Sequence, residues 1–269
     1  MTGENGTKSG YICIRIKKRV DMKTIKDILL GRTSVRRYTR DKLSQEELDF
    51  IYEAIQNTPT SYNGQQFSVI SVTDQDEKVL LYEITGQKQI KTCAAFLVFC
   101  ADYNKIRIAA NAIECPFPAF PDTMDGIMVG VIDAALAMQT AYISAMSIGL
   151  GGCCIGYTRT CDPERIAEIL QLPKGVFVVC GLAIGYPAES PDLKPKQPLS
   201  LVIHQNHYRD NDMRDDLLAY DKTISAYNRS RSGVTTDNDW ISHIVGYYND
   251  GMKYDIEGYL KRQGFEMRK

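Results

Sequence analysis

The sequence has few histidines, and its cysteines and histidines have none of the spacings typical of metal-bound or disulfide-stapled proteins. It contains eight cysteines but no Cys-x-x-Cys, and only three histidines. His204 and His207 have no cysteine or acidic partner at metal-ligand spacing. Several cysteines lie in apolar runs such as "FLVFCAD" and "VFVVCGLAIG", where a thiol is a small core residue. We therefore predict no metal site, no disulfide framework and a reducing, cytoplasmic compartment.

Nucleotide-binding signatures are also missing. No P-loop is present, and no G-x-G-x-x-G follows a strand pattern. The net charge of −1 argues against a general nucleic-acid binder. The basic residues are nevertheless concentrated at one end, since residues 1–42 hold twelve Lys/Arg and four Asp/Glu. That excess indicates either an acidic ligand near the N-terminus or a basic tail.

No linker or internal repeat divides the 269 residues, and 44% of them are apolar, enough for a large core. The first ten residues are polar and glycine-rich, and Met22 opens "MKTIKDILLGR", which reads like a natural start. No secretory signal is visible, because "YICIRI" is too short for its apolar segment. We expect residues 1–21 to be a dispensable, disordered basic extension, and residues 22–269 to form a single domain.

Hydrophobic periodicity predicts an α+β fold with a sheet between helices. Ser44 and Glu47 form a capping-box pattern before a helix, and Gly86 closes another. The apolar segment 126–148 is long enough to cross a membrane, but Asp133 and Gln139 interrupt it. We interpret it as a central helix, buried on nearly all sides, that reaches a subunit interface. Strands are predicted at 66–74, 95–102 and 175–187 and in "LSLVI", helices at 22–31, 44–57, 76–86, 161–173 and beyond 212, and a surface loop at 103–125.

Three separate segments suit an anionic, planar ligand. In "GRTSVRRYT" (31–39), Arg32 and Arg36 lie on one side of an extended chain with Ser34 between them, and together they can hold phosphate oxygens. "PTSYNGQQF" (59–67) offers donors and acceptors for a heterocycle, and "DLKPKQP" (192–198) places two lysines on one side. Each segment also has an ordinary explanation: an exposed basic strand, a connecting loop and a solvated turn. The glycines of "GLGGCCIGYTR" (149–159) let backbone approach a flat ligand.

In this order and spacing, these segments and "TGQKQIK" resemble the FMN-dependent nitroreductase/flavin reductase superfamily. The resemblance is closest to its oxygen-insensitive, NADPH-preferring branch, which includes the flavin reductase of luminous bacteria. It extends from about Met22 to the C-terminus. It implies a nitroreductase-like fold, with a mainly antiparallel or mixed sheet between helix layers and an extended C-terminal segment. It also implies a homodimer with FMN at the subunit interface.

The resemblance also implies roles for individual residues. Arg32, Ser34, Lys194 and Lys196 would bind the FMN phosphate, with Arg36 reaching toward the ribityl chain or pyrimidine edge. Arg231 would recognise the 2′-phosphate of NADPH. Gln66 departs from the usual proline, Lys196 replaces a frequent arginine, and Cys154 is interpreted as packed. The full implied FMN set is Arg32, Thr33, Ser34, Arg36, Thr60, Ser61, Asn63, Gln87, Cys154, Ile155, Gly156, Lys194 and Lys196.

The activity implied is hydride transfer from NADPH, or NADH, to the flavin N5. Electrons would then pass to a nitroaromatic, quinone or similar small-molecule acceptor in a ping-pong mechanism. The flavin would carry the chemistry, so no protein acid, base or nucleophile is required. We expect no nucleic-acid or membrane partner. Alternatives are a dedicated NADPH-flavin reductase, a non-catalytic flavin-binding redox sensor and, from the basic N-terminus, a nucleic-acid-binding arm.

Overall fold

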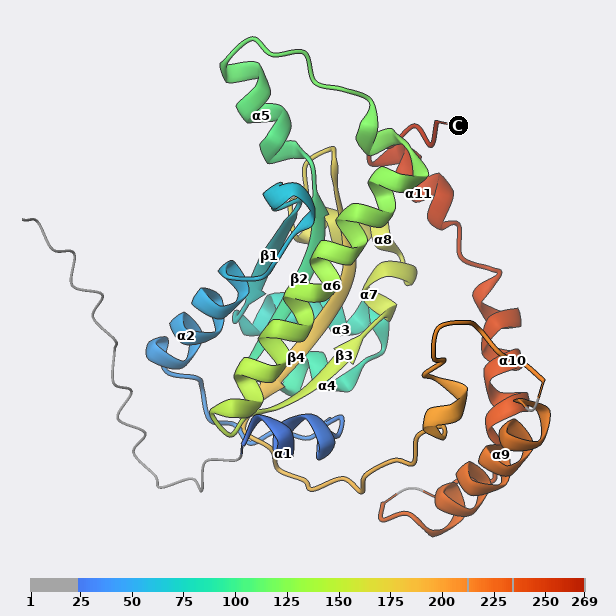
Figure 1. The fold of residues 1–269 in the computed structure, drawn as a ribbon. Helices are drawn as coiled ribbons and strands as arrows, with labels where there is room; N and C mark the ends of the chain where they lie inside the picture. Colours follow the sequence, from blue (N-terminus) through green and yellow to red (C-terminus); the bar gives the residue numbers. More distant parts are fainter. Residues whose placement is uncertain (1–23, 212, 234, 269) are drawn as a thin grey trace, which may run out of the picture.

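An antiparallel sheet lies at the centre of the molecule (Figure 1). The computed structural model describes residues 24–211, 213–233 and 235–268. Within these residues the sheet has four strands in the order β1-β2-β4-β3, so β1 and β3 form its edges. Each neighbouring pair is antiparallel. The strands are β1 (Phe67–Val72), β2 (Ala95–Asp102), β3 (Gly151–Ile155) and β4 (Val176–Gly185).

Helices cover both faces of this sheet, as the alternation of side chains along β2 requires. Leu97 and Phe99 enter one core with α2 and α6, whereas Phe96 and Val98 enter the other with α3, α4 and α8. All eight residues of β2 are buried. This confirms the predicted α+β class with a sheet between helix layers. The covering helices are α2 (Gln45–Gln56), α6 (Met124–Ser147), α3 (Gln75–Thr85), α4 (Lys88–Thr92) and α8 (Pro163–Ile169).

Helix α6 is the helix whose length and composition would also suit a membrane span. In the structure it packs against β2, β4 and α2. The expectation that it is buried on nearly all sides is wrong for the single protomer, because apolar residues recur every fourth position on an exposed row. That row consists of Met124 (58% exposed), Met128 (53%), Ile132 (52%) and Leu136 (42%).

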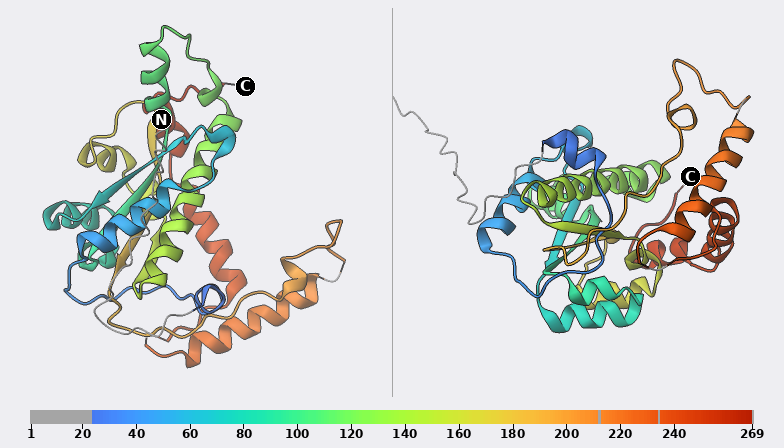
Figure 2. Two further views of the ribbon diagram at one scale, coloured as in Figure 1. Left: turned by 60° about the vertical axis from the view of Figure 1, so that its left-hand side comes forward. Right: turned by 90° about the horizontal axis from the view of Figure 1, so that it is seen from below.

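The C-terminal segment leaves the sheet after β4 and runs extended along the body, as the resemblance implied. It then forms α9 (Met213–Ser230) and α10 (Trp240–Gly251), which project from the body (Figures 1 and 2). Helix α11 (Ile256–Arg262) returns to the sheet, where Phe265 is buried in the core with α6. The remaining elements are α1 (Ile25–Leu30), η1 (Ser61–Asn63), α5 (Asn104–Ala112), η2 (Phe120–Asp122), α7 (Tyr157–Thr160) and η3 (Leu199–Leu201).

Three segments differ from the sequence prediction. The expected loop at 103–125 contains α5 and η2, although α5 buries none of its residues. The expected strand "LSLVI" contains η3 instead, with Leu199 and Ile203 exposed, because no strand of the described residues lies beside it to pair with. Strand β3 was missed, because "GGCCI" is glycine-rich and gains its extended form from pairing with β4. Residues 1–21 lie outside the described part of the chain.

Candidate functional site

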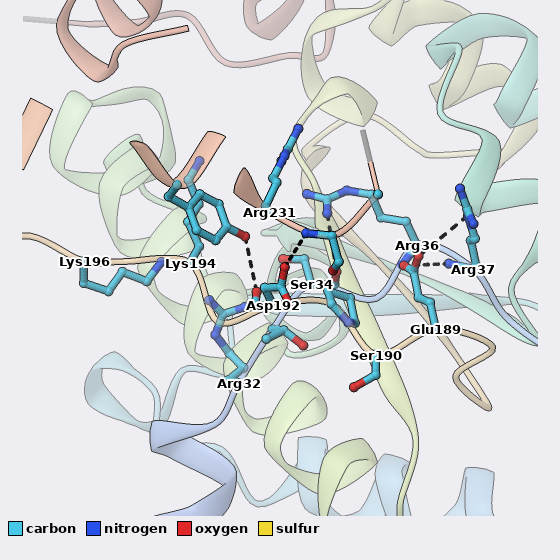
Figure 3. Close-up of a pocket in the computed structure, with 15 residues that line it drawn as sticks. Arg32, Ser34, Arg36, Arg37, Glu189, Ser190, Asp192, Lys194, Lys196 and Arg231 are labelled. Atoms are coloured by element: carbon cyan, nitrogen blue, oxygen red, sulfur yellow. Dashed lines mark hydrogen bonds and ion pairs between the residues drawn. The ribbon is translucent and has the colours of Figure 1, made fainter. Parts of the chain in front are cut away.

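A cavity of about 500 Å³ lies between the arginine segment, the extended chain after β4 and the end of α9 (Figure 3). Six cationic and two acidic side chains line it, so its formal charge is +4. The lining residues are Arg32, Thr33, Ser34, Arg36, Arg37, Glu189, Ser190, Pro191, Asp192, Lys194, Lys196, Tyr227, Arg231, Ser232 and Gly233. Seven of the fourteen sequence-predicted site residues therefore meet in one cavity that suits an anion.

The arginine segment is extended because the edge of the sheet holds it. The Val35 amide donates to the carbonyl of Gly152 (3.0 Å), and the Val35 side chain is buried. A Cβ at position 151 would lie 2.8 Å from the Val35 Cβ, so this close approach requires glycine there. With Val35 directed inward, the alternation of an extended chain directs Ser34 and Arg36 to the opposite side.

Tyr142 of α6 contacts the Arg32 side chain. Its hydroxyl lies 2.7 Å from the carbonyl oxygens of both Thr33 and Gly152, and it accepts a bond from Arg32 Nη1 (3.4 Å). The Arg32 guanidinium also lies 5.6 Å from the centre of the Tyr142 ring. Burial raises the pKa of Tyr142, which keeps the hydroxyl protonated and able to donate. Arg32 is thus partly pre-arranged at the cavity wall.

The cations of the extended chain after β4 are close enough to affect one another. The pKa of Lys194 is lowered by partial withdrawal from water and by the positive charges of Lys196, Arg231 and Arg36. A bound anion would offset that repulsion. The carboxylate of Glu189 offsets part of this positive charge. Its Oε1 also accepts hydrogen bonds from the backbone amides of Arg36 (2.6 Å) and Arg37 (3.1 Å).

A second group of predicted residues surrounds the outer edge of β3. Gln89 Nε2 donates to Gln87 Oε1 (2.9 Å) and approaches the sulfur of Cys153 (4.0 Å). Ile155 is buried, so only its backbone can face a ligand. Gly156 is exposed, and a Cβ added there would meet no atom within 4 Å. Since β3 pairs with one strand only, and Val35 and Tyr142 bond to its edge at the Gly152 carbonyl, the outer edge beyond Gly152 leaves backbone groups open to a flat ring.

The expectation that Cys154 is packed is wrong for this protomer. Cys153 is buried, whereas Cys154 is exposed on the edge strand. Its surroundings still withdraw the sulfur from bulk water and, with the neighbouring Cys153, raise its pKa to about 11. The thiol is therefore almost fully protonated at neutral pH. Among the residues that the structure describes, no group of three or more His, Cys, Asp or Glu side chains could hold a metal ion.

The third predicted group, Thr60, Ser61 and Asn63, lies apart from the cavity. The Ser61 amide donates to Asp133 Oδ1 (3.1 Å), near the middle of α6. Arg32 instead contacts Tyr142, nine residues further along the same helix, which corresponds to about 13 Å of helix axis. None of the three residues lines the cavity. Within one protomer, the structure does not bring this loop to the cations.

Sequence reasoning missed the residues that organise the cavity. Glu189 and Asp192 lie in a turn-like, charged stretch where an acid reads as ordinary surface charge. Tyr142 lies in a helix whose sequence signal is its apolar length. None of the three has a sequence spacing that marks it. Asp192 is part of "DLKPKQP", but the sequence assigned a role only to the two lysines of that segment.

Comparison with known proteins gives consistent matches along the chain. Residues 29–186 match the family model described as "Nitroreductase family", and residues 194–268 match "Nitroreductase family, C-terminal domain". The FMN reductase [NAD(P)H] of Bacillus subtilis is 37% identical over 90% of this chain and 97% of its own. The oxygen-insensitive NADPH nitroreductase of Salmonella typhimurium is 36% identical over 90% of this chain and 98% of its own.

Solved structures agree in fold. The hypothetical oxidoreductase YcnD of Bacillus subtilis superposes with a TM-score of 0.87 at 36% identity, covering 91% of this chain and 99% of its own. The NADPH:FMN oxidoreductase of Vibrio harveyi, in complex with NAD+, gives 0.80 at 27% identity, covering 91% and 99%. The similarity therefore includes the C-terminal segment that contributes Lys194, Lys196 and Arg231 to the cavity.

Proposed function

This chain belongs to the nitroreductase family, and from that membership we propose that it is an FMN-dependent, NAD(P)H-consuming oxidoreductase. When bound, FMN supplies the redox chemistry, accepting a hydride from NAD(P)H and returning two electrons to a small-molecule acceptor. The acceptor class is nitroaromatic, quinone or similar. The observation that carries the proposal is the cavity, in which arginines from residues 32–36 meet lysines from residues 194–196.

The chain's own residues have binding and orienting roles. Arg32, Ser34, Lys194 and Lys196 hold the FMN phosphate by charge-assisted hydrogen bonds, and Thr33 lines the same wall. The lowered pKa of Lys194 supports this assignment, because it records crowded positive charge that a dianion would neutralise. Arg36 extends the cation row toward the ribityl chain or pyrimidine edge.

The flavin ring lies along the outer edge of β3 in this proposal. Cys154, Ile155 and Gly156 present backbone there, and Gln87 is linked to the strand through Gln89, which approaches Cys153. The open space beside Gly156 supports it, since the chain's own packing does not require a glycine at that position. The role of these residues is to orient the ring and to limit access of water to one of its faces.

A second copy of the chain completes the site. The loop with Thr60, Ser61 and Asn63 contacts α6 at Asp133, too far along the helix from Tyr142 and Arg32 to serve the same protomer's cavity. We therefore assign these three residues to the partner's flavin. The exposed apolar row of α6 supplies a surface for the second copy to cover, and α10 carries a similar row, Ile241, Val245 and Tyr248, which Met252 extends just past its end. Substituting Ile132→Asp, in the middle of the α6 row, should yield monomers by light scattering and lower flavin content. A dimer that persists with full flavin would contradict the assignment.

NADPH is the preferred coenzyme in this proposal, with Arg231 as the contact to its 2′-phosphate. Arg231 lines the cavity next to Lys194, where it adds a guanidinium that suits a second phosphate. Arg231→Ala should lower kcat/KM for NADPH by about tenfold and leave NADH nearly unchanged, since only NADPH carries the group. Equal losses for both coenzymes would remove Arg231 from specificity. We also propose a cytoplasmic location, in keeping with the buried thiols of Cys93 and Cys100.

The first test of the function is optical. The purified protein should be yellow, and its absorbance near 450 nm, a region typical of bound flavin, should bleach on adding NADPH without oxygen. Re-oxidation by a quinone or nitroaromatic, faster than by free FMN, favours the general reductase over a dedicated flavin reductase. Bleaching without multiple turnovers on any acceptor would favour the redox sensor.

A further inference from the structure

Two tyrosines of helix α9 bond to the backbone of the lysine segment, residues 192–196. The Tyr220 hydroxyl donates to the carbonyl of Pro195 (3.3 Å), and the Tyr227 hydroxyl donates to the carbonyl of Asp192 (3.4 Å). Residues seven apart lie on the same face of a helix, so one face of α9 follows the backbone that carries Lys194. The end of α9 is therefore fixed relative to that lysine.

The last contact of this series uses a carboxylate. Asp192 Oδ2 accepts from the backbone amide of Ser232 (2.6 Å), directly after the end of α9. The preceding amide, of Arg231, donates to the carbonyl of Tyr227 (2.8 Å). The backbone of Arg231 thus lies between two anchors, one within its own helix and one on the segment that lines the cavity.

The charge of Asp192 is unfavourable for this place in two respects. The carboxyl end of a helix carries partial negative charge, so an acid there gains nothing from the helix dipole. Asp192 also lines a cavity whose other side chains favour anions, and it would repel a phosphate. The hydrogen bonds from Ser232 lower its pKa, so it is charged at neutral pH. A carboxylate at this position therefore has a use other than attracting the ligand.

We propose that Asp192 is a positioning residue for coenzyme selection, which holds the turn after α9 so that Arg231 faces the cavity. The inference rests on the proposed function, because it assigns Asp192 to the recognition of the 2′-phosphate by Arg231. Asp192 does not touch the coenzyme in this account. It acts through the Ser232 amide and the turn that this amide begins.

Electrostatics alone and positioning predict opposite signs for the same substitution. If Asp192 contributed only its charge, Asp192→Ala would raise the positive potential of the cavity and improve the use of NADPH. If it positions Arg231, the same change releases the turn and selectively impairs NADPH. Asp192→Asn keeps an oxygen acceptor for the Ser232 amide without the charge, whereas Asp192→Glu keeps the charge but displaces the oxygen.

The experiment measures kcat and KM for NADPH and NADH, with flavin content, in the FMN-loaded dimer. We expect Asp192→Ala and Asp192→Glu to lower kcat/KM for NADPH by about five- to tenfold, mostly through KM, with NADH unchanged. Asp192→Asn should remain within about twofold of wild type. Asp237→Ala is the matched control, because it removes one exposed acid from the connection between α9 and α10 without lining the cavity.

The outcomes separate this inference from the function it rests on. Faster use of NADPH by Asp192→Ala, or equal losses for both coenzymes, would overturn it. So would a selectivity that changes in Arg231→Ala but not in Asp192→Ala or Asp192→Glu, and that result would leave the proposed function intact. Loss of NADPH preference in none of the three variants, Arg231→Ala included, would instead remove the proposed role of Arg231. If Asp192→Ala fails to fold, Asp192→Glu decides.

Discussion

Replacing Arg32 with alanine tests the assignment of the cavity most directly. Arg32 is half-buried, its guanidinium lies over the Tyr142 ring, and it shares the cavity with Lys194 and Lys196. The substitution removes one donor fork and leaves Tyr142 bonded to backbone carbonyls, so it opens no unsatisfied group in the core. The fold should therefore survive, and the effect should fall on the ligand.

The expected magnitude follows from one lost charge-assisted interaction. A hydrogen bond to a charged group contributes about 1.5–3 kcal/mol, which corresponds to about a ten- to hundredfold weaker FMN affinity. Contact with Tyr142 already restricts the Arg32 side chain, so less rotamer entropy is lost on binding and the upper half of that range is expected. Arg32→Lys keeps the charge and loses the fork, so its affinity should lie between wild type and alanine.

Arg37→Ala is the matched control, because it removes the same charge from the same segment. Its side chain is 75% exposed and pairs with Glu189 at 3.7 Å. An exposed ion pair contributes little, so FMN affinity should change by less than about threefold. Quenching of FMN fluorescence on titration with the apoprotein gives both affinities. Raising the salt concentration should weaken binding in wild type more than in Arg32→Ala, since screening acts on each charge contact.

Two results would refute this reasoning. Full flavin retention in Arg32→Ala would place the phosphate elsewhere. Equal losses in Arg32→Ala and Arg37→Ala would show that the cavity responds to total charge rather than to a specific contact.

Four further tests probe other parts of the chain. A chain that begins at Met22 should keep its flavin, dimer and turnover, and loss of any of them would give residues 1–21 a structural role. Gly181→Ala drives a Cβ into the ring of buried Phe96 and should cost about 1–3 kcal/mol in urea unfolding. The Cβ of Gly156→Ala meets no atom, so this change should leave stability unchanged while weakening FMN binding. A loss of stability with unchanged FMN binding would place the flavin elsewhere. Because the pKa of Cys154 is raised to about 11, its alkylation by iodoacetamide should accelerate about tenfold per pH unit from 7 to 10, and a plateau near pH 8 would contradict that shift.

Local sequence signals predicted the elements whose stabilising contacts are local. The capping box of Ser44 and Glu47 forms both of its bonds, and Gly86 closes α3 with a positive φ of 67°. Strand β2 was predicted with its observed bounds, because a continuous apolar run as short as eight residues suits a strand buried on both faces. Strand β3 could not be predicted in this way, since its extended form depends on pairing with β4.

The candidate site shows the same division. Each cationic segment could be recognised singly, and the family resemblance linked them. The contacts that organise them are tertiary: Tyr142 beneath Arg32, Glu189 on the amides of Arg36 and Arg37, and Asp192 at the end of α9. Acids that support cations through backbone amides have no spacing of their own in the sequence. The row of α6 that was predicted to be buried is exposed in the single protomer, because composition alone does not show which face the sheet leaves uncovered.

The cavity takes its first cation from residue 32 and its last from residue 231, on opposite sides of the whole sheet in chain order. During synthesis the sheet is complete at Gly185, yet Arg231 is added 46 residues later (231 − 185), about 2–9 seconds at typical ribosomal rates. A nascent chain with a finished sheet therefore has no finished phosphate site, and its main core still lacks Tyr259, Leu260 and Phe265. On the proposed function, flavin is acquired after the sheet has been synthesised, so nascent chains released before Arg231 remain colourless.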